Sequence, residues 1–72
     1  MAFDYSKLRG KIVEVFGTQS ACAKQLNTSE RTLSLKLNGR IFFSQDEILR
    51  LADCLGLTET DIPIYFFTQK VQ

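Results

Sequence analysis

The chain has 72 residues, of which 44% are hydrophobic, and its formal net charge is +1 at neutral pH. This length suits one small domain with a single core, and the apolar content argues against a disordered chain. The apolar runs are short, so the sequence predicts neither a membrane-spanning segment nor a secretory signal.

Residue types that carry enzyme chemistry are scarce in this chain. It has no histidine, and Cys22 and Cys54 lack the close spacing of a zinc or redox motif. We expect both cysteines to be buried thiols of a cytosolic protein. The sequence also has no Gly-rich phosphate loop and no nucleophile beside a recognisable base. It therefore predicts a protein that is not an enzyme and that needs no metal, cofactor or small-molecule ligand.

Charge is distributed unevenly along the chain. Residues 1–43 contain seven Lys or Arg and three acidic residues, a net charge of +4. Residues 44–72 contain two basic and five acidic residues, a net charge of −3, and the two halves add to +1. We expect the positive half to face nucleic-acid phosphate, and ordinary solvated surface charge is the alternative.

The first helix is predicted over residues 5–16. Asp4 is its expected N-cap, and Gly17 supplies a left-handed end. Its inward face is predicted from helical spacing and consists of Tyr5, Leu8, Ile12, Val15 and Phe16.

Two short helices joined by a polar turn follow. Thr18 is a natural N-cap for the first, predicted over residues 19–26, and Ser29 or Thr28 caps the second, predicted over residues 30–37. The turn consists of Asn, Thr and Ser, whose side chains bond to nearby backbone and tolerate unusual backbone angles. This pattern is typical of a helix-turn-helix.

The motif spans residues 18–39 and ends at an Asn-Gly turn signal. The second helix must cross the first at a steep angle, and the small side chain of Ala23 permits that approach. We expect Leu26, Leu33 and Leu37 to hold the two helices together. Cys22 is expected to face inward. The second helix then keeps a short-chained polar outer face, as suits a helix in a major groove.

Two more helices are predicted after the motif. Ser44 and Glu47 form a capping box for the first, which Gly56 ends. Its inward stripe is Ile48, Leu51, Ala52 and Leu55. A short fifth helix is capped by Thr58 or Thr60 and limited by Pro63. We expect Phe43 and Phe66 inside the core and residues 68–72 to fray.

The motif resembles the helix-turn-helix of the lambda-type repressor/Cro family of temperate phages of Gram-positive bacteria. The matching positions are Gln19, Ala23, Leu26, Leu33 and the pair Asn38-Gly39. The chain is also similar in size and plan to modulator-of-repression proteins of phages of lactic-acid bacteria. The resemblance implies an all-α, five-helix, lambda-repressor-like domain over residues 1–72.

Two positions depart from the family pattern. Asn27 stands in the turn where the family usually has Gly, and Asn tolerates the left-handed conformation better than most residues. Lys36 stands where an apolar residue is common.

The outer face of the second motif helix predicts the DNA-reading residues. Arg31 is the leading candidate, because a guanidinium can bond to guanine O6 and N7 together, and the alternative is a solvated arginine paired with Glu30 or Glu14. The full predicted base-reading set is Ser29, Glu30, Arg31, Ser34 and Leu35. The predicted contacts to the DNA backbone are Thr18, Gln19, Thr32, Lys36, Asn38 and Arg40.

Two functions follow from the resemblance. The first is a Cro-like regulator that places the second motif helix in the major groove of duplex DNA and pairs on operator half-sites about 34 Å apart. The second is a modulator or antirepressor that binds a partner phage repressor and alters its DNA binding. A possible partner surface is Leu35, Tyr65 and Phe67. An antitoxin-like regulator has no specific support.

The expected partners are therefore double-stranded DNA and either a second copy of the chain or a phage repressor. A membrane partner is not expected. The resemblance implies a location in the cytoplasm of the bacterial host cell.

Overall fold

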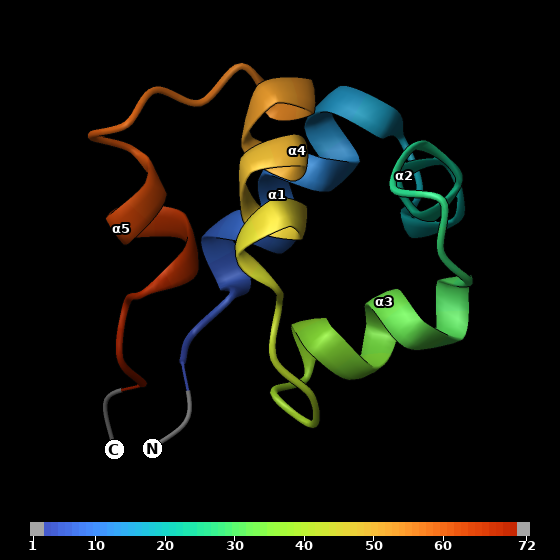
Figure 1. Cartoon of the computed structure of the whole chain (residues 1–72), viewed down its shortest axis with the longest axis horizontal. Coiled ribbons are helices and arrows are strands. Elements are labelled where there is room, and N and C mark those ends of the chain that lie inside the picture. Colours follow the sequence, from blue (N-terminus) through green and yellow to red (C-terminus); the bar gives the residue numbers. More distant parts are fainter. Residues whose placement is uncertain (1–2, 71–72) are drawn as a thin grey trace.

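Five helices follow one another in the computed structural model, which describes residues 3–70 (Figure 1). This confirms the predicted small all-α fold. Outside the helices, one isolated antiparallel bridge pairs Phe3 with Gln69. The helices are α1 (Ser6–Phe16), α2 (Gln19–Gln25), α3 (Glu30–Leu37), α4 (Gln45–Leu55) and α5 (Ile62–Phe66).

Side-chain caps explain where α2, α3 and α4 begin. The hydroxyl of Thr18 accepts a hydrogen bond of 3.1 Å from the Ala21 backbone N–H. Ser29, and not Thr28, does the same for α3, at 3.0 Å. Ser44 opens α4 with the predicted capping box. Each cap is worth about 1 kcal/mol, and each depends only on local sequence.

The predicted caps of α1 and α5 are wrong. Tyr5 occupies the N-cap position of α1, and the Asp4 carboxylate instead accepts a hydrogen bond of 2.9 Å from the Ser6 N–H. Neither threonine proposed for α5 caps it. Asp61 occupies that position, and its carboxylate accepts a bond of 3.0 Å from the Thr58 N–H.

The core lies where α1 packs against α2, α4 and α5, and α3 adds Leu33 and Leu37 to it. The predicted inward stripes of α2, α3 and α4 are largely confirmed. Phe66 is buried as expected, and Phe43 is partly buried against the core. The side chains that are almost wholly enclosed are Leu8, Ile12, Cys22, Leu33, Leu51 and Phe66.

Two predictions of burial fail. Val15 is 46% exposed, because α1 turns only one side toward the core and Val15 lies beyond its edge. Cys54 is half-buried near the end of α4, whereas Cys22 is fully buried. Burial raises the pKa of the Cys22 thiol to about 11, so this sulfur is held as the inert neutral thiol.

The chain ends are tied together in the described part. The Asp4 N–H donates a hydrogen bond of 2.7 Å to the Thr68 carbonyl, next to the bridge between Phe3 and Gln69. Residues 68 and 69 therefore do not fray as predicted. The last two residues of that predicted tail, 71–72, lie outside the described residues.

Within residues 3–70, no helix has the length and apolar character needed to cross a membrane.

Candidate functional site

Helix α2 packs against α3, and Ala23, the small residue predicted to permit their close approach, is almost completely buried. The Thr28 N–H donates a hydrogen bond of 3.0 Å to the Ala23 carbonyl and ties the turn to α2. Asn27 has a φ of 56°, the left-handed conformation expected where the family has Gly. The turn therefore forms without glycine, and α3 lies at one side of the molecule (Figure 1) with Leu33 and Leu37 in the core.

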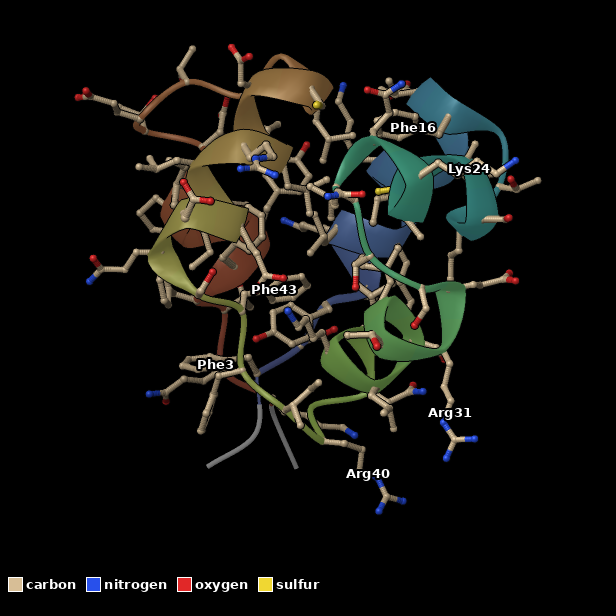
Figure 2. All side chains as sticks on the ribbon, turned by 45° about the vertical axis from the view of Figure 1, so that its right-hand side comes forward. Phe3, Phe16, Lys24, Arg31, Arg40 and Phe43 are labelled. Atoms are coloured by element: carbon tan, nitrogen blue, oxygen red, sulfur yellow. The ribbon has the colours of Figure 1, made fainter. Side chains whose placement is uncertain are left out.

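The predicted base-reading residues are only partly on an open surface. Glu30 and Arg31 are exposed, and Figure 2 shows the Arg31 guanidinium projecting away from the protein. Ser34 and Leu35 are half-buried. Ser29 is exposed, but its hydroxyl already accepts the Thr32 N–H and donates to the Thr32 hydroxyl at 2.8 Å.

The alternative pairing considered for Arg31 is not present. Glu14 pairs with Lys11 at 2.9 Å, and within residues 3–70 neither Arg31 nor Arg40 forms an ion pair. Both guanidinium groups extend in the same direction from the lower edge of the molecule in Figure 2. This edge therefore presents two arginines to a partner.

The residues predicted to contact the DNA backbone differ in their exposure. Thr18 and Arg40 are exposed, and Gln19 and Thr32 are half-buried. Asn38 is exposed and lies just beyond the C-terminal end of α3. These five residues remain predicted contacts.

Lys36 is the exception, because the structure buries the side chain that was predicted to contact the DNA backbone. Only 9% of Lys36 is exposed, and its ammonium forms an ion pair with Glu47 of α4. The same ammonium lies 5.9 Å from the centre of the Phe43 ring. The residue fills the apolar position of the family pattern with its aliphatic chain and neutralises its charge internally.

The carboxylate of Glu47 has two roles in this contact. It pairs with Lys36, and its other oxygen accepts the Ser44 N–H at 2.8 Å in the capping box. Burial acts to raise the pKa of Glu47, but the hydrogen bonds from Lys36 and Ser44 outweigh it and hold the pKa below its usual value. The pair therefore joins the end of α3 to the start of α4.

Arg9 holds the end of α3 from the other side, and no sequence signal marked it. Its guanidinium donates a hydrogen bond of 2.8 Å to the Leu37 carbonyl and a second to the Asn38 side chain. A cation at a helix C-terminus satisfies carbonyl groups that lack helical partners and complements the helix dipole. The orientation of α3 thus depends on α1 and α4 as well as on α2.

The predicted partner surface of Leu35, Tyr65 and Phe67 is not one surface. Leu35 lies on α3, and the other two lie at α5, on the opposite side of Figure 1. Tyr65 is half-buried against the core. Phe67 instead lines an apolar groove of about 230 Å³ with Gln45, Ile48, Leu49 and Ile62.

The loop between α3 and α4 carries a further exposed surface. Phe42 is 80% exposed and Ile41 is 42% exposed, directly after Arg40. The sequence predicted Phe43, and not Phe42, inside the core. The structure agrees, because Phe43 packs against the core and Phe42 remains in solvent.

Side chains that could hold a metal ion are not clustered in the part of the chain that the structure describes. Residues 3–70 contain no cluster of three or more possible metal-ligating side chains. The candidate site is a surface that combines two outward arginines, short polar side chains on α3 and the exposed apolar side chains after Arg40.

Comparison with known proteins places the chain beside a solved phage protein and within a protein family. The chain is 50% identical to the modulator of repression of the temperate bacteriophage TP901-1 from Lactococcus lactis, with a TM-score of 0.80 against its solution structure. The match covers 100% of this chain and 97% of that one. No curated protein sequence matches the chain. A family described as "Protein of unknown function (DUF739)" matches residues 1–69, and the chain belongs to this DUF739 family.

Proposed function

We propose that this chain is a modulator of phage repression, which binds a partner repressor and changes how that repressor occupies its operator. The observation that carries the proposal is the 50% identity, over the whole chain, to the TP901-1 modulator. At this level of identity and coverage, a shared surface chemistry is a reasonable expectation as well as a shared fold. Of the two functions expected from the sequence, this one has the stronger support.

The structure is compatible with a small regulator that acts through contacts alone. The protein has an exposed edge with two outward arginines. Two of its exposed large apolar side chains, Ile41 and Phe42, directly follow Arg40. Arg and aromatic residues are the types that most often dominate the binding energy of protein interfaces. A single domain of 72 residues with such an edge suits a protein that docks onto another.

The test uses a phage repressor taken from the same genome as this chain. The purified repressor and this chain are mixed without DNA, and complex formation is measured by calorimetry and size-exclusion chromatography. We expect a stable complex. In a second assay, the repressor is bound to its operator, and addition of this chain should change the gel-shift pattern. Absence of both effects, with folded proteins, would contradict the proposal.

Direct DNA reading through α3, the Cro-like function, is the second candidate. It is favoured by the exposed Arg31 and Arg40, which have no ion-pair partner within residues 3–70. Selection from a random duplex pool at moderate salt tests it. A two-fold symmetric motif would support a homodimer on operator half-sites, and recovery of no motif would leave modulation through a repressor as the function.

A further inference from the structure

The loop that joins α3 to α4 displays an unusually exposed side chain, Phe42, between Gly39 and Phe43. Phe42 is 80% exposed, more than any other large apolar side chain that the structure places on the surface. A phenylalanine of this kind leaves much of its 150–250 Å² of apolar area in water, which is unfavourable for the isolated chain. The core does not need it, because Phe43 already fills the adjacent position.

This loop is fixed at both ends. The Gly39 N–H donates to the Lys36 carbonyl at 3.1 Å and the Arg40 N–H to the Leu35 carbonyl at 2.9 Å, while Gly39 adopts the left-handed φ of 76° that this helix ending requires. Immediately beyond Phe42, the chain is held again by burial.

The second anchor is aromatic. The Phe43 ring packs edge-on against Tyr5, with ring centres 5.5 Å apart, and against Phe66 at 5.6 Å. Figure 2 shows Phe43 within the body of the protein, while Arg40 projects from it. A side chain displayed on a fixed loop loses little conformational entropy on binding, so Phe42 is preorganised for a partner.

Cations stand beside this apolar display. Arg40 precedes it in the loop, and Arg31 on α3 extends in the same direction. Leu35 lies one helical turn after Arg31 on the same face of α3, and its half-buried side chain adds apolar area beside Arg31. The surface formed by Arg31, Leu35, Arg40, Ile41 and Phe42 is called the loop anchor below.

The chemistry of the loop anchor selects between two classes of partner. The phosphates of duplex DNA would satisfy the two guanidinium groups but would leave Ile41 and Phe42 in water. A protein surface with an apolar pocket bordered by Asp and Glu side chains satisfies both the cations and the apolar pair. An aromatic anchor flanked by Arg is also the usual composition of a binding hot spot.

We propose that the loop anchor is the surface by which this chain grips its partner repressor, with Phe42 inserted into an apolar pocket and Arg31 and Arg40 facing carboxylates around it. This inference rests on the proposed function and deepens it. The groove lined by Leu49 and Phe67, on α4 and after α5, is then not the main contact.

The experiment compares Phe42→Ala with a matched control, Leu49→Ala. Leu49 is also apolar and exposed, at 63%, but lies on the separate groove. Calorimetry measures binding of each variant to the phage repressor taken from the same genome as this chain. We expect Phe42→Ala to weaken binding by about thirtyfold, as for a hot-spot residue, and Leu49→Ala by less than about threefold. Because neither side chain is in the core, both variants should melt like the original protein.

A charge-reversal variant, Arg40→Glu, supplies an independent measurement. It should slow association with the repressor, and the difference from the original protein should shrink as salt rises.

The outcomes separate the two proposals. If the original protein binds the repressor and Phe42→Ala binds equally well, the loop anchor is wrong and the proposed function stands. If the original protein does not bind the repressor, the proposed function fails, and the inference fails with it. If Phe42→Ala weakens binding to duplex DNA and leaves repressor binding unchanged, the occupant is DNA and the inference is overturned.

Discussion

Glu47→Gln gives the sharpest test of how α3 is held. Glutamine retains the hydrogen-bonding oxygen of the capping box, so the start of α4 should survive. The ammonium of Lys36 would lose its carboxylate and remain in a site where its side chain is 11% exposed. The substitution therefore isolates the ion pair from the cap.

The size of the effect follows from burial. Removing one partner of a fully buried pair costs about 3–5 kcal/mol, and an exposed pair contributes about 0–1 kcal/mol. The side chains here are 11% and 22% exposed, which places the pair between these two limits. We expect a loss of about 2 kcal/mol, which lowers the Tm of a domain this small by roughly 8–16 °C.

The assay is thermal unfolding followed by circular dichroism at neutral pH, with Lys36→Met and the double variant included. A lysine-to-methionine change preserves the apolar stem and removes the charge. The double variant should regain most of the stability lost in Glu47→Gln, because it leaves no unpaired charge. An unchanged melt for Glu47→Gln, or a double variant no better than the single one, would refute the reasoning.

The same pair predicts a dependence on pH. The pKa of Glu47 lies below its ordinary value of 4.5, so its stabilisation is complete above that value. It is lost as the pH falls through the lower pKa of the folded state. The difference in stability between the original protein and Glu47→Gln should therefore shrink in acid.

The other predictions concern single positions. Arg31→Ala should abolish any preference for an operator sequence in a DNA titration, with little change in Tm, because the side chain is exposed; unaltered discrimination would remove Arg31 from the base-reading set. Ala23→Leu should destabilise the protein by about 1–3 kcal/mol or more by forcing α2 from α3, and an unchanged melt would contradict the crossing at Ala23. In the native protein, iodoacetamide should modify Cys54 well before Cys22, because Cys22 is buried with a pKa of about 11; equal rates would contradict this.

Local chemistry made much of the fold predictable. The starts of α2, α3 and α4 depend on hydroxyl caps within three residues, and the ends of α1 and α4 on glycines with positive φ. The left-handed turn at Asn27 was predictable for the same reason. The start of α1 was predicted one residue too early. The Asp4 carboxylate accepts a hydrogen bond from the first helical N–H, that of Ser6, but Tyr5 occupies the N-cap position.

The all-α class, the order of the helices and the caps of α2, α3 and α4 could be predicted from the sequence alone, because these depend on contacts between residues a few positions apart. Which of the predicted surface side chains are available to a partner depends on the tertiary structure. Lys36 turns inward because Glu47, eleven residues on, neutralises it, and Arg9 is committed to a carbonyl twenty-eight residues away. Phe42 and Phe43 divide between solvent and core because the aromatic rings of Tyr5 and Phe66 occupy only one side of the loop. These contacts join distant segments that meet only when the chain has folded, so no local pattern predicted the burial of Lys36 or the bond from Arg9 to α3.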